Sequence, residues 1–183
     1  MSGKLTLISS ATASGSSSID FTSGLQDYDE IIFYFVDIQH SNDDRFLEFQ
    51  VSTDASGHTY GQTITSTFFE AHHYWSWATD TSLSYDTSRD LAQSTSYQKL
   101  SQSSDNGGTV TGAALSGEMH LFGCASSSKV KHFYARTGNI YYIQGVYDNF
   151  ISGYVNQTTP LTAIRFRPDS NTFSGEIHMF GVS

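Results

Sequence analysis

The chain of 183 residues contains 13 Phe, 11 Tyr and 15 Gly but only one Cys, and its formal net charge is −9. This length suits one domain with a single core, and the mixture of aromatic residues and Gly favours strands joined by turns. The acidic balance and the scattered basic residues argue against nucleic-acid binding, the lone Cys124 excludes an intrachain disulfide, and no apolar run could span a membrane.

Small polar residues dominate the start of the chain. Residues 9–18 are only Ser, Thr, Ala and Gly, so residues 1–18 are expected to form a polar N-terminal arm or an edge strand. A single β-sandwich domain is expected over residues 19–183. The run at 31–36, Ile-Ile-Phe-Tyr-Phe-Val, is apolar on both faces and predicts a central strand. Alternation at 46–51 predicts its hairpin partner, with one face in solvent.

The middle of the chain, at about 54–112, is rich in aromatic residues and shows no clear period, which predicts an irregular segment. Both tryptophans lie there. Their rings fit three roles, which stay open at this point: filling the core, anchoring a subunit interface, or stacking on a sugar. The candidates for interface or glycan contact are His73, Tyr74, Trp75 and Trp77.

An internal repeat is the most informative pattern. Residues 116–123 read SGEMHLFG, and residues 174–181 read SGEIHMFG. In a strand, the aliphatic residues of each copy face one way and the Glu, His and Phe face the other. Two copies are too few for a solenoid or propeller. They indicate equivalent strands in an all-β fold, an antiparallel β-sandwich of jelly-roll type.

The same repeat supplies the best metal candidates, which are Glu118, His120, Glu176 and His178. If the two copies met, two imidazoles and two carboxylates could bind zinc. We favour the simpler interpretation, in which these are surface polar residues repeated because the strand is repeated. No cofactor is expected. The sequence contains no nucleophile elbow, phosphate-binding loop, zinc-protease helix or EF-hand loop, so we expect no enzyme activity.

The end of the chain resembles the C-terminal signature of small phage virion proteins. Residues 161–167 (LTAIRFR) match their apolar strand, and residues 173–182 (FSGEIHMFGV) match their closing strand, with Phe180 where Tyr is usual. The opening, at 19–25 and 28–31, is also similar. The resemblance implies a jelly-roll or lectin-like sandwich and a role as a capsid decoration (cement) or tail-associated subunit, and it supplies no catalytic residue.

We therefore expect a non-enzymatic structural protein of the virion, assembled in the host cytoplasm. Its expected partners are the major capsid protein, whose junctions it would stabilise, and itself, as a homotrimer, with no nucleic acid or membrane. The alternative is a tail-fibre or receptor-binding module that recognises a glycan on the host surface.

Overall fold

The computed structural model describes residues 3–75, 81–107, 111–141 and 145–182. The described chain is built from strands alone: β1 (Leu5–Ser16), β2 (Ile19–Phe21), β3 (Glu30–His40), β4 (Leu47–Ser52), β5 (Ile64–Tyr74), β6 (Thr81–Tyr85), β7 (Gln98–Lys99), β8 (Leu115–Phe122), β9 (Lys131–Tyr141), β10 (Gly145–Val155), β11 (Ala163–Pro168) and β12 (Phe173–Val182).

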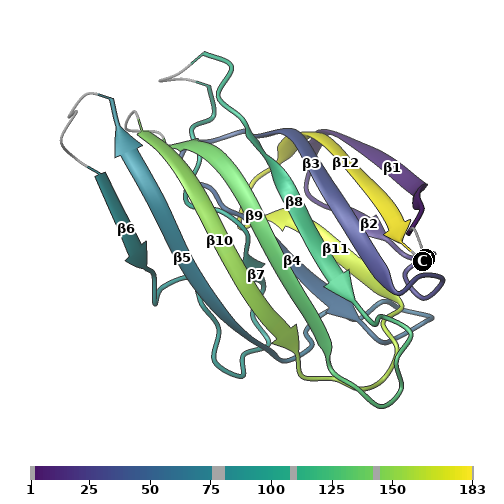
Figure 1. Cartoon of the computed structure of the whole chain (residues 1–183). Helices are drawn as coiled ribbons and strands as arrows, with labels where there is room; N and C mark the ends of the chain where they lie inside the picture. Colours follow the sequence, from purple (N-terminus) through teal and green to yellow (C-terminus); the bar gives the residue numbers. More distant parts are fainter. Residues whose placement is uncertain (1–2, 76–80, 108–110, 142–144, 183) are drawn as a thin grey trace.

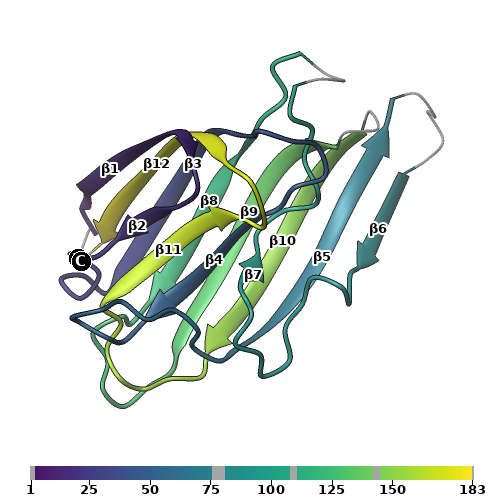
Figure 2. The same cartoon turned by 180° about the vertical axis from the view of Figure 1, so that it is seen from behind.

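The strands form two antiparallel sheets packed face to face. The large sheet has eight strands in the order β1-β12-β3-β8-β9-β10-β5-β6, and the small sheet has four in the order β2-β11-β4-β7. Figure 1 looks onto the outer side of the large sheet, and Figure 2 shows the small sheet in front of it. The expected antiparallel β-sandwich is confirmed, whereas its jelly-roll connectivity stays a prediction.

Phenylalanine rings form the centre of the core. Phe166 of β11 lies 5.0 Å from Phe33 and 5.2 Å from Phe35 of β3, centroid to centroid. Phe49 of β4 meets Phe133 of β9 edge to face at 5.1 Å. All five side chains are at most 1% exposed. Edge-to-face contacts of this kind add to the hydrophobic gain of burial and fix how the two sheets sit on each other.

The run at 31–36 lies within β3, an inner strand of the large sheet, as expected. The hairpin prediction is wrong, because β4 belongs to the small sheet and pairs with β11 and β7. The solvent face predicted for β4 is also wrong, since Glu48 and Gln50 are 6% and 0% exposed. The amide of Gln50 donates to the carbonyl oxygens of Gln62, Thr95 and Ser96, so distant segments cover this face.

The two copies of the repeat fall on β8 and β12, which pair with opposite sides of β3. Their aliphatic residues point into the core, as the alternation predicted. Met119 and Leu121 of β8 are fully buried, and Ile177 and Met179 of β12 are buried to the same degree. The two copies of the repeat therefore form equivalent strands, which pair with the two sides of β3 and bury the same positions.

Of the two forms expected for the start of the chain, an arm or an edge strand, the structure has the edge strand, whereas the middle segment differs from its description. Residues 5–16 form β1, which pairs only with β12, so this part of the chain is an edge strand of the large sheet. The segment at 54–112 is more regular than predicted. It contains β6, β7 and the eleven-residue β5, which pairs with β10 over its full length.

A buried polar network lies on part of the inner side of β9, β10 and β5, beside the apolar core residues of the same strands. The Asn149 side chain donates to the Thr137 carbonyl at 3.0 Å and to the Asn139 side-chain oxygen at 2.9 Å. Its own oxygen accepts from the backbone N–H of Gln102 at 2.9 Å, and the Gln102 amide donates to both oxygens of Glu70 at 3.1 Å. Hydrogen bonds therefore hold residues 100–105 on the sheet here.

A buried ammonium group closes one end of the sandwich. Lys131, at the start of β9, is 0% exposed. Its Nζ lies 2.6 Å from the carbonyl oxygens of Ser126 and Thr158, and 3.2 Å from those of Lys129 and Gln157. One side chain thus joins the turn after β8 to the segment after β10.

Candidate interaction face

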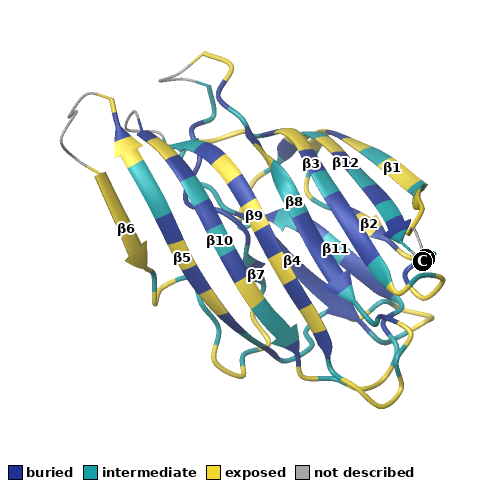
Figure 3. Ribbon diagram, in the orientation of Figure 1, coloured by how far each residue is buried: buried dark blue, intermediate teal, exposed yellow. Residues whose placement is uncertain are grey.

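The outer face of the large sheet points away from the small sheet (Figures 1 and 2). Exposed and buried residues alternate along β5, β9 and β10, and Figure 3 looks onto this face. One row of directly paired outward residues crosses all eight strands: Tyr85, Phe69, Phe150, Arg136, Glu118, Tyr34, His178 and Ser10. Side chains from distant parts of the sequence are thus brought side by side.

Arg136, at the middle of this row, forms a bidentate ion pair with Asp148. The Arg136 Nε donates to Asp148 Oδ1 at 2.9 Å, and its Nη2 donates to Asp148 Oδ2 at 2.6 Å. These hydrogen bonds raise the pKa of the Arg136 guanidinium. Both groups stay accessible, with 63% of the Arg136 side chain and 36% of the Asp148 side chain exposed. Exposed pairs add little stability, so the pair serves mainly to hold charged groups at a fixed place on the face.

Aromatic rings flank the ion pair. Phe150 is sandwiched between Phe69, stacked at 4.8 Å with an interplanar angle of 5°, and the Arg136 guanidinium, 5.0 Å from the ring centroid. Tyr134 stacks on His120 at 4.4 Å, and His120 Nδ1 lies 2.5 Å from Glu30 Oε1. Phe69 and Tyr134 remain 40% and 43% exposed. These rings are therefore immobilised by their neighbours yet open to solvent.

Three adjoining hollows run along the outer side of β9 and β10, and we call them together the β9–β10 groove. The first, of about 510 Å³, lies over Gly138 beside Val146. The second, of about 320 Å³, lies between Tyr134 and Phe69. The third, of about 290 Å³, extends toward Tyr154. Glu118 and Arg136 line both the first and the second hollow, and Ser152 lines both the second and the third.

The four candidate metal ligands do not come together. Glu118 and His120 lie on β8, Glu176 and His178 lie on β12, and β3 separates the two pairs. Two strand spacings place the pairs about 10 Å apart, with Tyr34 between them. His120 instead contacts Glu30, and His178 Nδ1 bonds the Ser10 hydroxyl at 2.8 Å. No group of three or more metal-binding side chains occurs among the described residues.

The three aromatic-segment candidates that the structure describes do not share one surface. His73 is exposed on the outer face, and Trp75 is 51% exposed just beyond the end of β5. Tyr74 is buried on the inner side, where its hydroxyl bonds that of Tyr147, so its assignment as a contact residue is wrong. Trp77 lies outside the described residues. Tyr74 sits on the inner side because side chains along β5 alternate between its two faces.

Sequence reasoning missed the residues that the fold assembles on this face, which are Phe69, Tyr134, Arg136, Asp148 and Phe150. They come from three strands, and no short motif joins them. A signal for part of the set was present: in an antiparallel pairing of 131–141 with 145–155, Arg136 directly opposes Phe150 and neighbours Asp148 diagonally.

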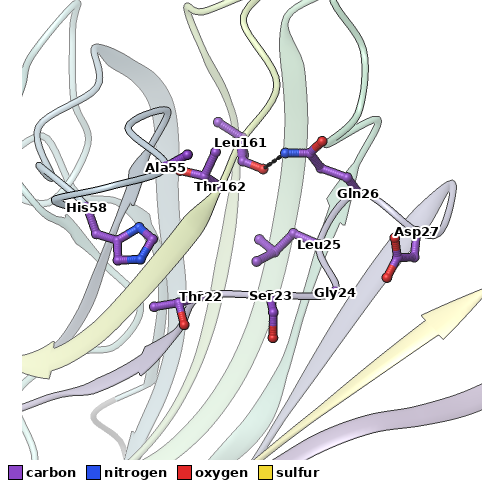
Figure 4. Close-up of a pocket in the computed structure, with 10 residues that line it drawn as sticks. All are labelled: Thr22, Ser23, Gly24, Leu25, Gln26, Asp27, Ala55, His58, Leu161 and Thr162. Carbon is purple, nitrogen blue, oxygen red and sulfur yellow. Dashed lines mark hydrogen bonds between the residues drawn. The ribbon is translucent and has the colours of Figure 1, made fainter.

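Two further hollows are lined by residues that do not belong to the large sheet. One, of about 290 Å³, has the buried Leu25 at its base, and the Gln26 amide donates to the Leu161 carbonyl at its rim (Figure 4). His58 and Asp27 lie at opposite ends of it, so its ionisable groups do not converge. The other, of about 410 Å³, includes the ion pair of Arg167 with Glu48.

Fold and surface together define an antiparallel β-sandwich that presents a broad aromatic sheet face. No protein-family model matches the chain, no curated protein is significantly similar to it, and no solved structure gives a significant match. None of the described residues belong to a helix that is long and apolar enough to cross a membrane.

Proposed function

We propose that this chain is a non-enzymatic structural subunit of a phage virion, which binds stoichiometrically to copies of itself and to the major capsid protein. As a decoration or cement subunit it would add buried surface at capsid junctions. The proposal combines the resemblance of the chain ends to phage virion proteins with the surface described above.

The observation that carries the proposal is the chemistry of the large sheet's edges. Soluble proteins usually protect edge strands with charged residues, proline or bulges. The edge strands β1 (Leu5–Ser16) and β6 (Thr81–Tyr85) contain no charged residue and no proline. The pairing of β1 has two irregularities, whereas that of β6 with β5 is regular. The β6 edge is therefore the better template for a strand of another chain.

The β6 edge also carries apolar surface. All five residues of β6 are exposed, and Leu83 and Tyr85 are 71% and 51% exposed. Both are on the outer side, next to Ala71 and the half-exposed Phe69 of β5. A partner strand would use the free backbone groups of this edge and bury these side chains.

The charged groups support a binding role over a catalytic one. Three of the arginines each form an ion pair with one carboxylate, and the three pairs lie apart from one another: Arg136 with Asp148, Arg165 with Asp20, and Arg167 with Glu48. A catalytic site gathers ionisable groups of different pKa around one cavity. These pairs instead hold neighbouring strands or lie along a surface.

The proposal is tested by mixing the purified chain with heads of its own phage that lack it, followed by sedimentation and electron microscopy. We expect saturable binding at regular positions on the head, and a homotrimer by light scattering. Leu83→Lys should weaken both associations, whereas Val36→Lys, on the outer side of the inner strand β3, should not. Failure to bind heads, or turnover of a substrate by the purified chain, would refute the proposal.

A further inference from the structure

The β9–β10 groove has the properties of a ligand site and not only of a contact surface. Its three hollows share lining residues, so they form one continuous depression. From Asp148 to Tyr154 along β10 the groove is about 20 Å long by strand rise. Its floor is low because Gly138 and Ser152 occupy outward positions where larger side chains would fill it.

The walls of the groove alternate between rings and polar groups. Tyr134 and Phe69 border the second hollow, and Tyr154 borders the third. Between them, Arg136 has N–H groups beyond the two that bond Asp148, and the carboxylates have free lone pairs. Because stacking and ion pairing already fix these side chains, a ligand would lose little entropy in ordering them.

The charge of the groove argues against an anionic ligand. The first hollow contains one guanidinium, from Arg136, and two carboxylates, from Glu118 and Asp148. The chain as a whole carries −9. A phosphate or sulfate group would be repelled by this arrangement, and a nucleic acid would find no clustered positive field.

The position of the groove argues against a peptide that adds as a strand. Both β9 and β10 are inner strands, paired with neighbours on each side over their lengths. Their backbone groups are occupied by these ladders, so recognition must come from side chains. Ring faces combined with fixed charged hydrogen-bonding groups suit a ligand with an apolar face and a rim of hydroxyls. A sugar ring has this character.

We propose that the β9–β10 groove binds a neutral oligosaccharide, with Tyr134 stacking on one sugar ring and Arg136, Asp148 and Glu118 bonding its hydroxyls. This binding does not depend on the virion proposal, since no residue of β6 lines the groove, and only Phe69 of β5 borders both. Trp75, one of the candidates for glycan contact in the sequence analysis, does not line the groove.

The test uses an array of neutral oligosaccharides built from hexoses, N-acetylhexosamines and deoxyhexoses, with sulfated and sialylated oligosaccharides on the same array. The strongest neutral oligosaccharide is then titrated by calorimetry into the full chain and its variants. We expect binding of neutral oligosaccharides only, weakened at least tenfold by Tyr134→Ala and by Arg136→Gln. Trp75→Ala, which removes an exposed ring outside the groove, should leave the affinity within twofold.

A second variant covers the case in which Tyr134→Ala disturbs the fold through its contact with His120. Ser152 is exposed between the second and third hollows, and Ser152→Tyr would fill the groove without removing a contact of the core. It should abolish binding while the circular-dichroism spectrum stays unchanged. The proposal is overturned if no neutral oligosaccharide binds, if anionic ones bind better, or if Trp75→Ala abolishes binding while Ser152→Tyr does not.

Discussion

Replacing Lys131 with Met removes the ammonium group that joins two ends of the sandwich. The four carbonyl oxygens around Nζ, from Ser126, Lys129, Gln157 and Thr158, then lose a charged donor. Met keeps most of the length and the apolar stem of Lys, so the substitution tests the charge and its hydrogen bonds and changes the packing little.

The expected cost follows from two opposing terms. An ammonium group can donate three hydrogen bonds, and each bond that involves a charged group contributes about 1.5–3 kcal/mol. Against this, the variant no longer buries a charge, which relieves a penalty of several kcal/mol. The carbonyl groups of the two turns can also regain water. We therefore expect Lys131→Met to reduce the free energy of unfolding by about 2–4 kcal/mol.

Urea unfolding, followed by tryptophan fluorescence and circular dichroism, measures this difference directly. The matched control is Lys129→Met, two residues earlier, where the side chain is exposed. Exposed substitutions usually change stability by less than about 0.5 kcal/mol. Equal stabilities of the Lys131 and Lys129 variants would show that the buried ammonium does not hold these turns together.

Three further predictions concern buried polar groups. Burial lowers the pKa of His40 from 6.5 to about 4, so between pH 6.5 and 4 the unfolded chain takes up a proton that the folded chain does not. At 1.36 kcal/mol per pKa unit, the free energy of unfolding of the wild type should fall by about 3 kcal/mol more over this range than that of His40→Gln. Parallel pH profiles of the two proteins in urea titrations would contradict this. Burial raises the pKa of Cys124 to about 12, so a thiol reagent at pH 8 should label it only after unfolding, and fast labelling of the native chain would count against its placement. Asn149→Leu leaves the hydrogen-bonding partners of the buried amide unsatisfied, so it should lower the free energy of unfolding by about 2–4 kcal/mol in the same urea assay. A loss below about 1 kcal/mol would be inconsistent with the network.

The layers of the fold were predictable because alternation in a strand assigns each side chain to a face. Met119 and Leu121 could be placed in the core from the repeat alone, since they alternate with the polar residues Glu118 and His120. The partner of each strand could not be predicted in this way. Residues 46–51 have the pattern of a half-buried strand, yet Glu48 and Gln50 are buried under segments that lie far along the chain. The pattern of polar and apolar residues within a strand does not show whether a distant segment covers its polar face.

The candidate face was only partly predictable for the same reason. Glu118 and His120 were correctly placed on one face, but whether Glu176 and His178 join them depends on strand order. One intervening strand, β3, is enough to separate the pairs. Exposed aromatic residues such as Phe69 and Tyr134 resemble core residues in a sequence, because an apolar side chain by itself does not reveal which side of a sheet is covered.

The two halves of the large sheet contact their covers through different proportions of apolar and polar interactions. Around β3, phenylalanine rings from both sheets interlock, whereas under β10 and β5 amide and carboxylate hydrogen bonds at Asn149 and Glu70 hold part of the cover beside a smaller set of apolar contacts. A hydrogen bond within the protein replaces hydrogen bonds to water, so burying polar groups contributes less net free energy to folding than burying the same area of apolar surface. Amide hydrogen exchange should therefore find the β5–β6 side opening at lower free energy than the β3 side. The half of the large sheet that carries the exposed β6 edge would then be the one that adjusts its conformation to a binding partner, while the half around β3 stays rigid.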